Sequence, residues 1–254
     1  MNARFASAVP PVLALALFLV MWETACRALQ IPSFVLPPPT AILSALAGAD
    51  WQIMAMHTWA TLEIVLVGFG ASVLFSIPIS LLLAGSPLMK SALMPLLIII
   101  HSLPIVALAP IIIVALGADL TSKAVITCLI SYFPMVISAT TGLLAAPPEM
   151  IELSRSLRGS KFRELWDIRL PSAIPYVFAS LRVASTLAVI GAVVGEFVSS
   201  ERGLGYLVLF STSLMRLPQS FSALIILILM SLTLYWLVTL VQRIFFPWSI
   251  TAKT

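Results

Sequence analysis

The sequence predicts an all-α membrane protein that crosses the bilayer about six times. Hydrophobic residues make up 61% of the 254-residue chain, and charged residues make up only 9%, against roughly 25% in a soluble domain. The apolar residues are gathered into runs of about 20, which is the length that a helix needs to cross a hydrocarbon core of about 30 Å. No linker rich in Ser, Gly or Pro separates the runs, so we expect residues 1–254 to form a single transmembrane domain.

Six segments meet this length criterion. We expect spans at residues 9–29, 64–84, 91–118, 124–146, 172–198 and 222–241. The third span contains Pro95, Pro104 and Pro110, which predict bends or a partly re-entrant course. Residues 30–59 contain three consecutive prolines and are expected to form an external loop with a surface helix, and the apolar stretch 204–214 is too short to cross.

The distribution of Lys and Arg predicts the orientation of the chain. If the amino terminus is inside, the inner segments hold nine of these residues and the outer segments hold four. Cytoplasmic loops of membrane proteins are enriched in Lys and Arg. We therefore expect both termini, and the loop between the fourth and fifth spans, to be cytoplasmic.

A charged segment of 21 residues, 149–169, interrupts the apolar sequence between the fourth and fifth expected spans. It holds nine of the 24 charged residues in the chain, so it is where we expect the chain to meet a soluble partner. Pro147 and Pro148 can end the fourth span and begin a new helix, on which Leu153 and Leu157 share one face. An ordinary hairpin at the membrane surface is the alternative.

The second half of this segment is expected to form another short helix. Gly159 and Ser160 offer a break, after which Phe162, Leu165 and Trp166 form a second apolar stripe with charges around it. The pattern predicts two short amphipathic helices that are joined at a glycine, within a cytoplasmic loop at about 147–171.

The same segment carries a spaced motif. An E-L-S triplet is followed by I-x-L-P at offsets of 16 to 19 residues from the glutamate. The motif residues are Glu152, Leu153, Ser154, Ile168, Leu170 and Pro171. This arrangement resembles the EAA loop of ABC importer permeases, which reads E-A-A, three residues, G, nine residues, I-x-L-P. Arg158 occupies the glycine position of that pattern, and Gly159 follows one residue later.

Further motifs extend the resemblance over about residues 55–245. They are His101-Ser102-Leu103-Pro104, Ala107-Leu108-Ala109-Pro110, Phe133-Pro134, the run I-G-A-V-V-G-E-F at 190–197, and Gly203-Leu204-Gly205. They resemble permeases of the nitrate/sulfonate/taurine group, which includes importers of thiamine-precursor pyrimidines. The resemblance implies a MetI-like permease fold, a pore made of two copies of the chain, and a location in the bacterial inner membrane.

The resemblance also implies partners and assigns residues to them. Two ABC ATPase subunits would dock on the cytoplasmic loop, and a binding protein would deliver a small solute from outside. The loop residues that this implies for ATPase coupling are Glu152, Leu153, Ser154, Arg155, Leu157, Arg158, Gly159, Phe162, Leu170 and Pro171. Among them Leu153, Leu157 and Phe162 would be apolar anchors, with charged residues as a polar rim.

The chain lacks the motifs of an enzyme. No GxxxxGK[ST] phosphate loop occurs, so ATP and Mg²⁺ would be bound by the partner ATPase and no cofactor by this chain. His57 and His101 have no neighbouring Cys or paired carboxylates suited to metal or nucleophile chemistry, and the basic residues lack the aromatic interleaving of a nucleic-acid surface. The alternative function is a secondary transporter or channel that acts without ATP. Intramembrane carboxylates on several spans would favour it, and this chain has essentially none.

The fifth span contains two ionisable residues, Arg182 and Glu196. They are 14 positions apart, hence about 21 Å along a helix, and cannot pair directly. We expect Arg182 to extend toward the inner surface. Glu196 is expected to hold the outer loop by pairing with Arg202 or with a partner subunit, and direct contact with substrate is the alternative.

The remaining candidates line the transport path or pack helices together. Gly191 and Gly195 form a small-xxx-small pair, which allows close approach of helices, at a dimer interface or at the path. His101 lies close to Pro104 in a long apolar span, where it can line the path or titrate, or act as a hydrogen-bonded core residue.

Overall fold

The computed structural model describes residues 2–250, and side chains from residue 9 onward. Within these residues the chain forms helices and no strand, which confirms the all-α class. Five helices are long and apolar enough to cross a membrane on their own. They are α1 (Asn2–Ala28), α3 (Trp51–Gly85), α6 (Leu120–Leu144), α9 (Leu170–Val198) and α11 (Leu217–Phe245).

The remaining apolar span, which is the third in chain order, is broken. α4 (Pro87–Ser102) and α5 (Ile105–Leu116) are bent by 92° at Leu103 and Pro104, as a broken span or a re-entrant loop. Pro104 lies at the N-cap position of α5 with extended backbone angles, so the bend falls at this proline. Pro95 and Pro110 lie inside helices that continue past them. The prediction of about six apolar spans with a bent third one is therefore confirmed.

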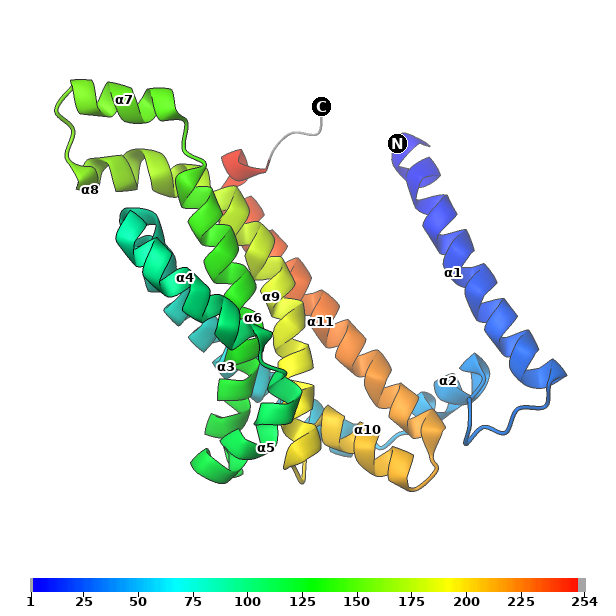
Figure 1. The fold of residues 1–254 in the computed structure, drawn as a ribbon. Coiled ribbons are helices and arrows are strands. Elements are labelled where there is room, and N and C mark those ends of the chain that lie inside the picture. Colours follow the sequence, from blue (N-terminus) through cyan, green and yellow to red (C-terminus); the bar gives the residue numbers. More distant parts are fainter. Residues whose placement is uncertain (1, 251–254) are drawn as a thin grey trace.

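The helices alternate in direction, as Figure 1 shows. α7 (Pro148–Ser156) and α8 (Lys161–Glu164) lie at the same end of the molecule as the start of α1 and the end of α11. α2 (Pro39–Ala47), α5 and α10 (Leu204–Ser213) lie at the opposite end. The charged segment and both described ends of the chain therefore share one side, as the charge distribution predicts.

The bundle is centred on α6, which packs against α9 and α3. Small residues allow this close packing. A side chain at Gly142 would approach the Cβ of Tyr176 on α9 to 2.8 Å, and one at Gly191 would approach the Cα of Thr127 on α6 to 2.7 Å. The main buried cluster lies between α3, α9, α10 and α11 and includes Val65 and Leu204. The short helix α10 is therefore part of the core.

The segment between the first two spans differs in part from the expectation of an external loop at 30–59. α2 is the expected short helix, but α3 begins already at Trp51. The side chain of Asp50 caps this helix by accepting hydrogen bonds from the N–H groups of Gln52 (2.9 Å) and Ile53 (3.3 Å). Asp is a favoured N-cap residue, so α3 extends beyond the apolar run on which the span estimate was based.

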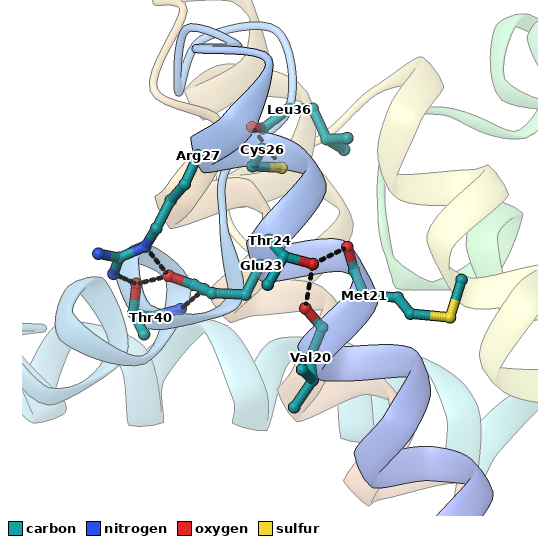
Figure 2. A network of polar contacts seen from close by, with 8 residues as sticks. All are labelled: Val20, Met21, Glu23, Thr24, Cys26, Arg27, Leu36 and Thr40. Carbon is teal, nitrogen blue, oxygen red and sulfur yellow. Dashed lines mark hydrogen bonds and ion pairs between the residues drawn. The ribbon is translucent and has the colours of Figure 1, made fainter.

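The C-terminal end of α1 is fastened to α2 by a polar network (Figure 2). Glu23 accepts hydrogen bonds from Arg27 (2.6 Å) and from the backbone N–H of Thr40 (3.1 Å), near the start of α2. The thiol of Cys26 contacts the carbonyl of Leu36 at 3.7 Å. The two charges that interrupt the first apolar run therefore compensate each other and hold the loop that follows. Trp22 of α1 also packs against Phe221 of α11, with ring centroids 5.9 Å apart, and the rest of α1 stands apart from the bundle.

Candidate functional site

The charged segment forms a projecting hairpin of helices at one end of the bundle (Figure 1). α7 and α8 are separated by a turn at 157–160, and the Ser160 side chain caps α8 by accepting from the N–H of Arg163. The short first helix and the break at Gly159 and Ser160 are as predicted, but the second helix is not a separate short one. α8 continues through a π-helical turn, Leu165–Arg169, into α9. The second helix is therefore an extension of the fifth span, and Leu170 and Pro171 form the first turn of α9.

The turn after α7 explains the unusual pair of Arg158 and Gly159. The N–H of Gly159 donates to the carbonyl of Ser154 (2.7 Å), and the N–H of Arg158 donates to that of Arg155 (3.0 Å), which is a Schellman motif. Arg158 has a φ of +53° in this motif, a conformation that favours glycine. Gly159 is needed for a different reason, because an added Cβ would lie 2.9 Å from the Ser154 carbonyl oxygen.

The hairpin exposes apolar side chains. Leu157 is 75% exposed and Phe162 is 71% exposed, and Leu153 is also exposed. Leu153, Leu157 and Gly159 lie around a hollow of about 220 Å³ between the two arms of the hairpin. Glu152 and Arg158 are exposed at the same hairpin. Exposed apolar groups with a polar rim are typical of a surface that binds a protein partner.

An ion-pair network ties the hairpin to the spans. Glu164 is buried and accepts two hydrogen bonds from Arg169, at 2.9 and 2.7 Å. Arg155 on α7 lies 3.6 Å from the other carboxylate oxygen of Glu164. Arg169 also donates to the carbonyl of Leu143 at the end of α6 (3.2 Å). Glu164 on α8 thus links α7, through Arg155, to the π-helical turn before α9, and Arg169 extends this link to α6.

Sequence reasoning assigned no role to Glu164 or Arg169. Their spacing of five residues does not match the usual pairing of residues three or four apart on an α-helix. The π-helical turn between them supplies the altered spacing. Arg155, which was expected only as part of a polar rim, is also drawn into this network.

At the opposite end of the bundle, Glu196 holds the start of α10. Its side chain is almost fully buried, with 1% exposed. It accepts hydrogen bonds from the hydroxyl of Thr61 (2.7 Å) and from the N–H of Gly205 (2.6 Å). Thr61 in turn accepts from the N–H of Leu204 (2.7 Å). The N–H groups at the beginning of a helix have no partner within the helix, and here a carboxyl oxygen of an α9 side chain accepts from one of them.

A histidine completes this arrangement. The Nδ1 atom of His57 on α3 accepts a hydrogen bond from the N–H of Gly203 at 3.0 Å. Gly203 has a φ of +126°, and a side chain there would collide with the carboxylate of Glu196. The expected ion pair between Glu196 and Arg202 is not formed among the described residues. His57 was given no structural role because residue 57 was assigned to an external loop, and Thr61 fell between that loop and the expected second span.

A large hollow of about 1030 Å³ lies beside this network. Its lining includes Lys123, Glu196, Arg202 and Tyr206, and Lys123 donates to the hydroxyl of Ser200 at 2.8 Å. Gly195 packs against Lys123, and Gly191 packs against Thr127 on α6. The small-xxx-small pair therefore joins α9 to α6 within one copy of the chain.

His101 lies at the break of the third span. Its ring stacks on Phe133 of α6, with centroids 4.0 Å apart and planes at 9°. His101 and Pro104 are both exposed. Irregular backbone at membrane depth occurs where it lines a water-filled cavity or is covered by protein. Arg182 on α9 donates to the side-chain oxygen of Gln242, near the C-terminal end of α11.

Comparison with solved structures identifies the fold. A chain of the MetNI methionine ABC transporter, in inward-facing conformations, matches with a TM-score of 0.66 and 17% identity, over 76% of this chain and 95% of that chain. The fold is therefore that of a MetI-like ABC permease. Residues 76–250 match the binding-protein-dependent transport system inner membrane component family, and the chain belongs to this family.

Curated relatives agree with this family. A probable ABC transporter permease protein of Haemophilus influenzae is 34% identical over 94% of this chain and 97% of its own length. The riboflavin transport system permease protein RibX of Chloroflexus aurantiacus is 35% identical, over 92% and 88%. The formylaminopyrimidine transport permease protein ThiX of Halalkalibacterium halodurans is 31% identical, over 96% and 98%. The chain is a transmembrane permease subunit of an ABC importer, not its ATPase.

Proposed function

We propose that two copies of this chain form the pore of the importer, and that an ABC ATPase subunit docks on the α7–α8 hairpin of each copy. The exposed apolar face of the hairpin carries this proposal. It offers Leu157 and Phe162 to a partner, and Glu164 connects it to α6 and α9. The partner ATPase would bind ATP and Mg²⁺. Its movement would reach the spans through the hairpin and produce alternating access.

The placement of the other partners follows from the arrangement of the helices. The hairpin and both chain ends would face the cytoplasm, where they carry most of the Lys and Arg residues. The α10 end would face outward, and a binding protein would deliver a small solute there. The relatives are named for the transport of riboflavin and formylaminopyrimidine, so a small organic solute is the class that we propose.

Charge changes on the hairpin test the coupling. Purified permease and ATPase subunits are reconstituted in vesicles with the binding protein, and ATP hydrolysis and uptake are measured together. Glu152→Ala and Arg158→Glu should lower uptake per ATP hydrolysed and leave folding intact. Lys90→Glu, an exposed charge reversal at the same end of the molecule, should leave this ratio unchanged. Normal coupling in both hairpin variants, or uptake by the permease without the ATPase, would contradict the proposal.

Cross-linking tests docking directly. Leu157→Cys and Leu88→Cys each place a thiol at a residue that is more than 70% exposed. In a background without Cys26 and Cys128, a bifunctional thiol reagent should link only the Leu157 variant to a cysteine-bearing ATPase. Equal cross-linking of both variants would indicate random collision and would refute docking at the hairpin.

A further inference from the structure

A basic hollow lies between the first half of α9 and the C-terminal end of α11. It measures about 290 Å³, and its polar lining is Arg182, Thr239, Gln242, Arg243 and Ser249. It lies at the end of the bundle that carries α7 and α8, because α11 ends there at Phe245. Neither the coupling hairpin nor the outer network includes any of these side chains.

The polar groups of the hollow are held in place by a buried amide. Gln242 is only 4% exposed, and its side-chain oxygen accepts a hydrogen bond from Arg182. Its side-chain nitrogen donates to the hydroxyl of Ser249 at 3.0 Å, and Ser249 donates to the carbonyl of Phe246 at 2.7 Å. A guanidinium has five N–H donors, so this contact fixes Arg182 and leaves donors for a ligand.

The hollow has two positive charges and lacks a negative one in its lining. Neither Arg182 nor Arg243 forms an ion pair within 4.0 Å in the described part of the chain. Two guanidinium groups that share a partly dry site repel each other unless an anion lies between them. The fork of an arginine matches a phosphate group, to which it can donate two parallel hydrogen bonds.

The surroundings of the hollow are those of a membrane surface. Leu240 and Ile244 on α11 are exposed apolar residues, and only 17% of the most apolar part of α11 is buried. Trp248 is exposed just beyond the end of this helix. Tryptophan is enriched where hydrocarbon meets water, and basic pockets between helices at the cytoplasmic surface bind lipid head groups.

We propose that this hollow binds the phosphate group of an anionic phospholipid, with Arg182 and Arg243 as its ligands and Gln242 as the residue that positions Arg182. The bound phosphate would join α11 to α9, the span that continues from the coupling hairpin. A soluble phosphate shares this chemistry, so the experiment separates the two sources. The site lies within the permease chain itself and does not depend on which solute is imported.

The test is a thermal-shift titration of the purified permease in detergent. The probes are dioleoyl phosphatidylglycerol, dioleoyl phosphatidylcholine and inorganic phosphate. We expect phosphatidylglycerol to raise the melting temperature of the unmodified protein more than phosphatidylcholine does. Stabilisation by inorganic phosphate but not by phosphatidylglycerol would support the same site with a soluble ligand.

Three variants decide whether the hollow is responsible. Arg243→Gln, at an exposed residue, should weaken phosphatidylglycerol binding about tenfold, the loss that follows from removing one charge-assisted hydrogen bond. Gln242→Glu keeps the size of the side chain and should abolish binding by neutralising Arg182. Arg216→Gln, at the opposite end of α11, removes the same charge and should have no effect. Unchanged binding in the first two variants, or an equal loss in the third, would overturn the proposal.

Discussion

The carboxylate of Glu196 accepts a hydrogen bond from the backbone N–H of Gly205, nine residues further along the chain, at 2.6 Å. This contact folds the outer loop back on the fifth span. Together with Thr61 and His57 on α3, Glu196 engages three successive N–H groups at the start of α10. α10 is thereby fixed to two spans at the end of the bundle opposite to α7 and α8.

Removal of the Glu196 carboxylate should loosen α10. Glu196→Ala leaves the N–H of Gly205 without its buried acceptor, and such an unpaired group costs about 1–3 kcal/mol, whereas the Thr61 hydroxyl can still donate to the carbonyl of His57. We expect a lower melting temperature and faster hydrogen exchange of the Gly205 amide. Glu201→Ala, an exposed carboxylate in the same loop, is the control and should change neither. Unaltered exchange at Gly205 would show that Glu196 does not hold the helix.

A side chain at Gly205 should also disturb this contact. An added Cβ would lie 2.7 Å from Oε2 of Glu196 and 3.2 Å from the backbone Cα of Val193, so the carboxylate would have to move from its position on the Gly205 N–H. Gly205→Ala should therefore destabilise the protein, as measured by thermal unfolding in detergent. Gly70→Ala is the matched control, because a Cβ there meets nothing within 4 Å. Alanine is favoured over glycine inside a helix by about 1 kcal/mol, so this control should be neutral or stabilising.

The span pattern and the α7–α8 hairpin could be predicted from the sequence because both depend on local signals. Runs of apolar residues set the spans, and prolines, glycine and spaced leucines set the two short helices. The spacing from Glu152 to Pro171 also led to the correct family. The predicted start of the second span was less accurate, because Asp50 caps α3 and lets the helix begin before the apolar run from which the span was predicted.

The partners of buried charges could not be predicted in the same way. Glu196 was expected to pair with Arg202, six residues away, but it binds Thr61, which is 135 residues distant in the chain. Such a contact depends on how α3 packs on α9, and no local pattern records it. Glu164 and Arg169 were missed because their pairing requires a π-helical turn.

The left-handed conformation of Arg158 predicts a stabilising substitution. A residue with a Cβ pays about 1–2 kcal/mol in this conformation, and glycine avoids that cost. Arg158→Gly should therefore strengthen the turn after α7 and slow hydrogen exchange of the Gly159 amide, which is bonded to Ser154. Gly159→Ala should have the opposite effect. Faster exchange in Arg158→Gly would show that the arginine side chain, and not the backbone, maintains the turn.

The network around Glu164 should determine how well the hairpin is coupled to the spans. Glu164→Gln leaves Arg169 partly buried without its countercharge, and a hydrogen bond to a charged group contributes about 1.5–3 kcal/mol. We expect a lower melting temperature, together with ATP hydrolysis that continues while uptake falls. The control is Glu149→Gln in the exposed first turn of α7, which should keep both activities.

A double substitution separates stability from coupling in this network. Replacing both Glu164 and Arg169 by Met removes the buried charges together, a change that is often neutral or stabilising because neither charge remains unpaired. The melting temperature should then recover, but the link from Arg155 on α7 to Leu143 on α6 stays broken. Uptake per ATP should therefore remain low in vesicles that contain the ATPase. If coupling recovers together with stability, Glu164 acts only on folding, and the movement of the hairpin reaches the spans through the continuous backbone of α8 and α9.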